Sequence, residues 1–208
     1  MALRILAILA LLLTVGGVIW FFRKHHGSWN TYKTWFVSEW KAAFGKEWKQ
    51  NWKKGVYFLT LISLVILALT GFIPYLIFGV PLGGFALMLH VALSPLFILL
   101  ITIIVLGWAN SRTFSGRHWN FITSDLFKKE KSQQAADDFF EKFFFWFIVL
   151  FSIITASMVF SMYPVLGTVG QEAILDVHRF SSVVLFIFFV LHTLRFVRLQ
   201  SSETAEQK

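Results

Sequence analysis

The chain contains no cysteine, and this excludes several classes of site before any motif is considered. Disulfides, iron–sulfur clusters, thiolate zinc sites and covalently attached c-type haem all require cysteine sulfur. Charged residues are also scarce: they make up 14% of the 208 residues, whereas 57% are hydrophobic. Because so little polar surface cannot cover a soluble domain of this size, we predict a small all-α integral membrane protein.

Acidic residues are missing from the centres of the apolar runs. Five of these runs are long enough to cross a bilayer as helices, at 3–22, 56–78, 85–108, 142–162 and 174–197. A transporter or channel needs intramembrane groups that bind an ion or relay a proton, so a transport function is disfavoured. The sequence also contains no recognisable motif for binding RNA or DNA.

The first apolar run begins like a secretory signal, because Arg4 precedes it. No small-x-small cleavage site follows, and the basic sequence RKHH stands where cleavage would be expected. We therefore predict that residues 1–27 form a retained, signal-anchor-like transmembrane helix.

Residues 28–54 combine aromatic and basic side chains in a helical pattern. Within 23–54 there are eight Lys or Arg against two Glu. The aromatic residues recur every four positions, at Tyr32, Phe36, Trp40, Phe44, Trp48 and Trp52. This pattern predicts an amphipathic interfacial helix that lies along the membrane surface. A docking surface for a partner subunit is compatible with the same pattern, whereas stacking on nucleic-acid bases is disfavoured by the flanking spans.

The basic residues also predict the orientation of the chain. Fourteen of the nineteen Lys and Arg lie in 23–54 and 109–142, and the short connections between the other spans carry none. The positive-inside rule then places both basic segments in the cytoplasm, with the N-terminus outside and the C-terminus inside. We expect a short surface helix within 109–141 and a polar tail at 199–208 that is disordered at its end.

Two histidines mark the last apolar run. His178 and His192 are fourteen positions apart, so they share one helix face and are separated by about 21 Å along the axis. His90 lies about six residues into the 85–108 span, and His178 about four residues into the 174–197 span. Because both spans run from outside to inside, these two histidines are predicted to lie at similar depth near the outer side.

Two neutral imidazoles that face each other from neighbouring helices can provide both axial ligands of a low-spin haem b. Such ligation leaves no open position on the iron, so this haem would transfer electrons. The alternative is that His90 and His178 hydrogen-bond to one another or to the backbone. Arg179 can pair with a haem propionate at the outer interface, or can serve as an interfacial anchor.

The inner site lacks an obvious second ligand. Ile104, fourteen positions after His90 on the same face, cannot ligate iron. His25, His26 and His118 are close enough in sequence to the inner side to reach it, but their spacing places none of them inside a span. Three roles therefore remain open for His192: a core histidine, the sole ligand of a second haem, or a hydrogen-bond donor to a quinone.

Residues 50–198 resemble the membrane cytochrome b subunits of respiratory formate dehydrogenases (the gamma subunit) and nickel–iron hydrogenases. The resemblance rests on HRFSSVVLFIFFVLH at 178–192, on the histidine early in the second core helix, and on ALTGFIPYL and FEKFFFWFIVLFSIITA. It implies a four-helix transmembrane haem-binding bundle at 55–198. The N-terminal helix and the interfacial helix are additions to the usual plan of the family.

The resemblance implies that His90 and His178 share the outer haem. In the family, the match to His192 shares an inner haem with a histidine that opens the first core helix, but Tyr57 stands at that position here. Because Tyr57 replaces the family's histidine, we expect one haem, and the inner haem and a quinone contact near Tyr57 stay open questions.

The implied function is a quinone-linked electron conduit in a bacterial inner membrane. The chain would be an electron-transfer subunit of an oxidoreductase complex, joined by other membrane subunits and a periplasmic iron–sulfur or multihaem subunit. Menaquinone or ubiquinone would be its membrane substrate. The competing interpretation is a haem-free membrane anchor or scaffold of a larger redox complex, in which the histidines are structural.

Overall fold

The structure, a computed structural model, describes residues 2–24, 29–45, 49–122, 133–161 and 166–206. It confirms an all-α membrane bundle, with no strand in these ranges. Four helical stretches are long and apolar enough to cross a membrane: Trp52–Phe78, Gly84–Arg112, Ala136–Phe160 and Gly167–Arg195. The chain is therefore a multi-pass membrane protein.

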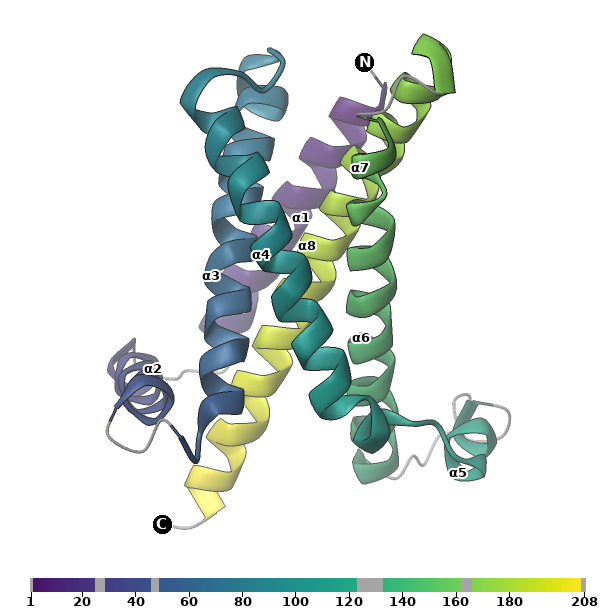
Figure 1. Cartoon of the computed structure of the whole chain (residues 1–208). Coiled ribbons are helices and arrows are strands. Elements are labelled where there is room, and N and C mark those ends of the chain that lie inside the picture. Colours follow the sequence, from purple (N-terminus) through teal and green to yellow (C-terminus); the bar gives the residue numbers. More distant parts are fainter. Residues whose placement is uncertain (1, 25–28, 46–48, 123–132, 162–165, 207–208) are drawn as a thin grey trace.

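The four spans form two antiparallel hairpins (Figure 1). In the first, α3 (Trp52–Phe72) and the π-helix η1 (Ile73–Phe78) are joined by a tight turn to α4 (Gly84–Trp108). In the second, α6 (Gln133–Ala156) and the short α7 (Met158–Ser161) precede α8 (Gly167–Glu206). Packing is closest within each hairpin, and contacts between the hairpins are fewer.

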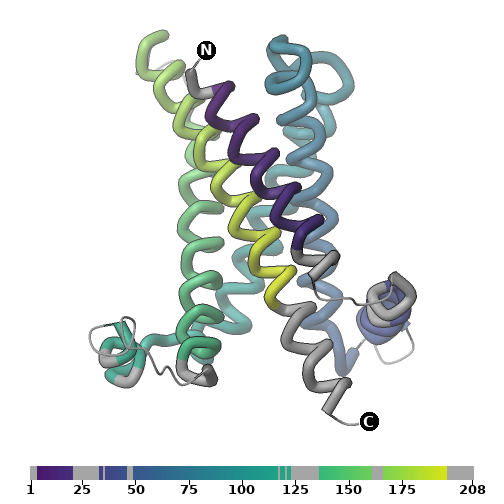
Figure 2. The backbone as a smooth tube through the Cα atoms, turned by 180° about the vertical axis from the view of Figure 1, so that it is seen from behind, coloured from purple at the N-terminus to yellow at the C-terminus, as the bar shows by residue number. Residues whose placement is uncertain are grey.

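The N-terminal helix α1 (Ala2–Lys24) lies beside α8, as Figure 2 shows from behind. Its 23 residues give a length of about 35 Å, which suits a bilayer core about 30 Å thick. The described apolar part of this helix, Arg4–Trp20, is shorter than the other four spans. A fifth span therefore stays a prediction.

The two basic segments lie at the same end of the bundle. Helix α2 (Trp29–Phe44) and helix α5 (Gly116–Asn120) flank the lower end in Figure 1, where the C-terminus also lies. The N-terminus and the turn between η1 and α4 lie at the upper end. This arrangement agrees with the predicted short helix in 109–141 and with basic segments that share one side of the membrane.

A buried apolar cluster holds the two hairpins together at mid-height. It is formed by Leu64, Phe97, Ile101, Ile148, Leu185 and Phe189, with Ile104 packed against it. These residues come from all four spans, so the cluster joins the hairpins. Phe188 of α8 packs against this cluster, and phenylalanines of α6 stack on it; the ring centroids of Phe147 and Phe188 are 4.7 Å apart.

Two irregular turns interrupt the helices near the upper end. Pro74 follows α3 and cannot donate a backbone hydrogen bond, and the chain continues there as the π-helix η1, which ends at Gly79 with φ 69°. Helix α6 ends at Ala156, and the Ser157 amide donates to the carbonyls of both Ile153 and Ile154.

Some helix boundaries differ from those that apolar composition predicts. Helix α8 begins at Gly167 instead of 174 and continues through the polar tail to Glu206; residues 207–208, the end of the predicted tail, lie outside the described residues. Helix α6 begins at Gln133 instead of 142, because its first turns are held by ion pairs to neighbouring helices.

Candidate functional site

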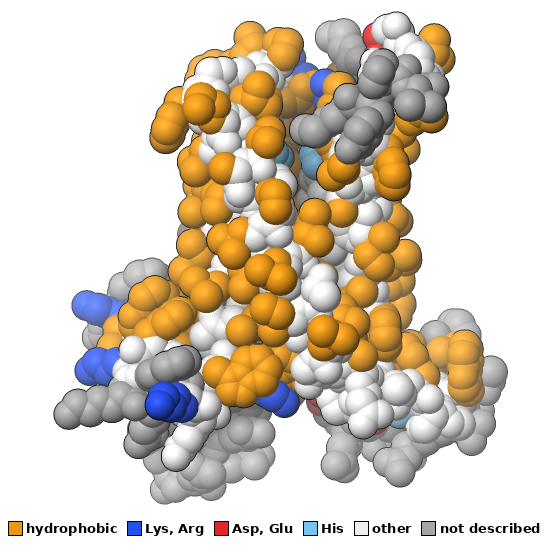
Figure 3. Space-filling model, viewed as in Figure 1, with side chains coloured by type: hydrophobic (Ala, Val, Ile, Leu, Met, Phe, Trp, Pro, Cys, Tyr) orange, Lys and Arg blue, Asp and Glu red, His pale blue; other side chains and the backbone are white. Residues whose placement is uncertain are grey.

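The structure brings His90 of α4 and His178 of α8 together across the gap between the hairpins. Their ring centroids are 6.2 Å apart, and the ring planes are inclined by 77°. Figure 3 shows a hollow between the two hairpins in the upper half of the molecule, with histidine side chains on its walls. Both side chains are only partly exposed.

The contacts of His90 with α3 favour a proton on its Nδ1. The Thr70 hydroxyl oxygen lies 2.9 Å from this nitrogen and within hydrogen-bond distance of the carbonyls of Ile66 (2.8 Å) and Leu67 (3.1 Å), so its single proton can serve a helix carbonyl while its oxygen accepts from the ring. The Leu67 backbone also hydrogen-bonds to the ring, and a carbonyl can only accept. Neutral His90 then carries its lone pair on Nε2.

The same logic applies to His178. Its Nδ1 lies 2.8 Å from the Thr155 carbonyl oxygen, which can only accept, so Nδ1 is the donor and Nε2 carries the lone pair. In a continuous helix the Thr155 carbonyl would accept from the amide four residues later. Because α6 ends one residue after Thr155, this carbonyl is available to the histidine.

The two rings are close enough to hold one metal centre between them, with centroids 6.2 Å apart. His90 and His178 would hold the iron of a haem b, which would supply one-electron transfer. An outer-shell acceptor on Nδ1, as both rings have, is typical of metal-bound histidine.

Other metal sites have less support. No group of three or more His, Cys, Asp or Glu side chains that could hold a metal ion occurs in the described part of the chain. Haem does not need such a group, because its porphyrin supplies four ligands and the protein supplies only the axial pair.

A glycine in α3 makes room for the His90 ring. A Cβ placed on Gly71 would lie 3.3 Å from His90 Cε1, which is closer than ordinary carbon contacts of about 3.5–4.0 Å. Thr70 and Gly71 are adjacent, so one turn of α3 provides both the acceptor and the space for this ring.

Arg179 lies one residue after His178, at the upper end of α8. Its Nη1 donates to Asp176 Oδ1 at 3.0 Å, and its guanidinium lies 4.5 Å from the ring centre of Tyr75 in η1. The side chain remains 32% exposed. Contact with a haem propionate at this position stays a prediction.

His192 lies in an aromatic environment nearer the lower end. Its ring centroid is 6.4 Å from that of Tyr57 and 6.2 Å from that of Phe144. The Tyr57 hydroxyl is directed to Thr193 Oγ1 at 3.4 Å, and Thr193 itself donates to the Phe189 carbonyl. No hydrogen bond between the His192 ring and another described residue is found, so its three proposed roles remain open.

The other candidate ligands of an inner site do not join His192 in the described structure. His118 is buried in α5, where its Nδ1 accepts from the Ser115 amide at 2.9 Å and its Nε2 lies 2.7 Å from Asp138 Oδ2. This places His118 in a polar contact between α5 and the first turn of α6. His25 and His26 lie outside the described residues.

Thr70, Gly71, Thr155 and Arg4 were not predicted as contributors to the site. The Arg4 guanidinium donates to the carbonyls of Leu76 (3.1 and 2.9 Å) and Ile77 (3.2 Å), so α1 supports the end of η1. Favourable contact between a cation and the last carbonyls of a helix is expected. In the sequence these positions stand out only as single polar or small residues within apolar runs, and the helical period does not indicate which residue each of them contacts.

Comparisons with known proteins add no assignment: no protein-family model, no curated protein and no solved structure matches this chain.

Proposed function

We propose that this chain is a membrane-anchoring cytochrome b-type subunit, located in a bacterial inner membrane, that carries one haem b between His90 and His178. When bound, haem b supplies reversible one-electron transfer. The subunit would connect a periplasmic iron–sulfur or multihaem partner to the menaquinone or ubiquinone pool. The observation that carries this proposal is the approach of the two rings, whose centroids are 6.2 Å apart, with each Nδ1 hydrogen-bonded to a protein oxygen.

Different residues would ligate the iron, orient its ligands and balance the charge at this site. His90 and His178 would hold the iron, and the Thr70 hydroxyl and the Thr155 carbonyl orient the two rings and increase their basicity. Arg179 stands at the upper end of the hollow, where it can balance the charge of a propionate. The basic segments at the opposite end favour a cytoplasmic location for that end, and this site would then face the periplasm.

Alanine variants of the three intramembrane histidines test the proposal. We expect His90→Ala and His178→Ala to abolish the low-spin haem spectrum, whereas His192→Ala, on the same helix as His178, retains it. His90→Gly with added imidazole should regain a low-spin signal, because the free ligand can enter the space of the lost side chain. Full haem content in both His90→Ala and His178→Ala, in protein that remains monodisperse, would refute the proposal.

A haem-free anchor is the second candidate. Its support is the inner site, where the Tyr57 hydroxyl is directed to Thr193 and no second histidine faces His192 in the described residues. Under this alternative the Nδ1 hydrogen bonds of His90 and His178 are purely structural. The purified protein would then carry no haem, and the histidine variants would change only its thermal stability.

A further inference from the structure

Helix α2 is attached to the bundle by one edge of its aromatic stripe. The rings of Phe36, Trp40 and Phe44 surround Phe58 of α3, with centroid distances of 5.7, 6.0 and 6.4 Å. Ala43 is buried at this edge, and Glu39 pairs with Lys54 at 2.8 Å. The side chain of Tyr32 and residue Trp48, which belong to the predicted stripe, lie outside the described part of the structure.

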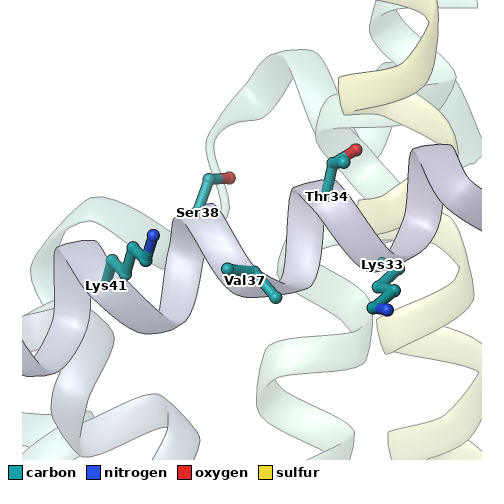
Figure 4. Close-up of a pocket in the computed structure, with 5 residues that line it drawn as sticks. All are labelled: Lys33, Thr34, Val37, Ser38 and Lys41. Carbon is teal, nitrogen blue, oxygen red and sulfur yellow. The ribbon is translucent and has the colours of Figure 1, made fainter.

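The neighbouring face of α2 stays open and is both apolar and basic. Phe36, Val37 and Trp40 are each at least 40% exposed, and they border a shallow groove with Lys41. A second hollow on the same helix is lined by Lys33, Thr34, Val37, Ser38 and Lys41. Figure 4 shows Thr34 and Ser38 projecting to one side of the helix, with the two lysines towards its ends.

The charge on this face is of one sign. Lys33 and Lys41 are eight residues apart, or about 12 Å along the axis. No carboxylate among the described residues pairs with either of them, and Glu39 is engaged with Lys54 at the attached edge. The face therefore offers cations, which suit a phosphate, beside aromatic surface, which suits hydrocarbon.

The position of α2 indicates where such a ligand would come from. Trp52 and Trp108 contact each other at this end of the bundle, with centroids 6.2 Å apart, and Lys53 Nζ lies 5.0 Å from the Trp108 ring. Tryptophan is enriched at the level of lipid headgroups. Helix α2 is seen almost end-on in Figure 1, so it runs across the spans, as a helix in the membrane surface does.

From these observations we propose that the groove of α2 binds an anionic phospholipid, with the headgroup phosphate at Lys33 or Lys41 and the acyl chains against Phe36, Val37 and Trp40. A free phosphate would not use the aromatic wall, and a zwitterionic lipid would gain less from two cations that no carboxylate of the described residues neutralises. This lipid site is separate from the His90–His178 pair, which lies towards the opposite end of the bundle.

Lipid titration of the purified full chain, followed by native mass spectrometry, tests this site. Wild-type protein should bind phosphatidylglycerol more tightly than phosphatidylcholine. A lysine near an anionic headgroup contributes about five-fold, and one headgroup contacts only one of these two lysines, so Lys33→Gln/Lys41→Gln should weaken phosphatidylglycerol binding about five-fold. Lys33→Arg/Lys41→Arg should retain it, and Lys49→Gln, a loss of one charge elsewhere in the same segment, should change it less than two-fold.

Three outcomes would overturn the proposal: equal affinity of the wild-type protein for the two lipids, unchanged phosphatidylglycerol affinity in the double glutamine variant, or equal weakening by Lys49→Gln. If the double variant kept its lipid affinity but lost a protein that copurifies from native membranes, the groove would be a docking surface for a subunit. The haem spectrum, recorded on the same samples, reports separately on the function proposed above.

Discussion

Replacing Thr70 by valine removes the acceptor of the His90 Nδ1–H bond and keeps nearly the same side-chain shape. In the structure this bond is 2.9 Å long, and the same hydroxyl also lies within reach of two helix carbonyls. In Thr70→Val the ring loses this hydrogen bond and keeps only its contact with the Leu67 backbone, so its tautomer and its rotation are fixed less firmly.

The size of the effect can be bounded in two ways. Loss of one hydrogen bond by a part-buried ring costs about 0.5–1.5 kcal/mol. Loss of an outer-shell hydrogen bond to a metal-bound histidine lowers metal affinity about 10–100-fold, which corresponds to about 1.4–2.8 kcal/mol. The two ranges meet near about 1.5 kcal/mol, so we expect Thr70→Val to lower haem affinity about ten-fold, with a changed reduction potential in the haem that remains.

The assay is haem content per chain by pyridine haemochrome, together with a redox titration of the visible spectrum. Thr60→Val is the matched control: Thr60 is fully buried in the same helix and donates to its own helix at Val56 (2.8 Å), but it contacts no histidine. Thr70→Ser, which keeps the hydroxyl, should behave nearly as wild type. Unchanged haem content and potential in Thr70→Val, or an equal loss in Thr60→Val, would refute the assigned role of Thr70.

Three further changes test other parts of the structure. Gly71→Leu should displace the His90 ring, because even a Cβ at this position would lie 3.3 Å from it. The haem content measured from the visible spectrum should fall, and a normal haem content would contradict this packing. Arg195→Ala removes the ion pair between Arg195 and the partly buried Asp137 carboxylate, and it should lower the free energy of unfolding by about 1 kcal/mol, seen as a fall of a few degrees in the melting temperature. An unchanged melting temperature would show that the pair is dispensable. Because the chain has no cysteine, a single introduced cysteine reports which side of the membrane it faces. Lys49→Cys should react with a membrane-impermeant maleimide added on the cytoplasmic side, and Gly83→Cys with the same reagent added on the periplasmic side. The reverse pattern would contradict the proposed orientation.

Much of the fold follows from the sequence because lipid requires long, uniformly apolar helices. Apolar run length predicted the four spans, and the tight turn at 80–84 correctly predicted an antiparallel hairpin of α3 and α4. Counting residues from the start of each span set His90 and His178 at one depth, and in the structure their rings are neighbours. These features depend on length and period, which a single sequence displays.

Features that depend on contacts between distant residues could not be predicted. The Thr155 carbonyl accepts from His178 only because α6 ends at Ala156, and nothing in the surrounding apolar sequence indicates this end. Arg4 contacts Leu76 across 72 positions. The family resemblance aligned Tyr57 with the histidine that would complete the inner site, and in the structure its ring lies beside His192. The direction of its hydroxyl, towards Thr193, depends on how the helices are rotated, which the sequence does not reveal.

The most direct test of the account is the dithionite-reduced minus oxidised visible spectrum of the purified wild-type protein, with haem quantified per chain. The paired histidines predict about one b-type haem per chain, low-spin, with a sharp alpha band. Two haems would show that His192 has a ligand other than those in the described structure. Absence of haem from monodisperse protein would contradict the central claim and leave the chain as a structural anchor.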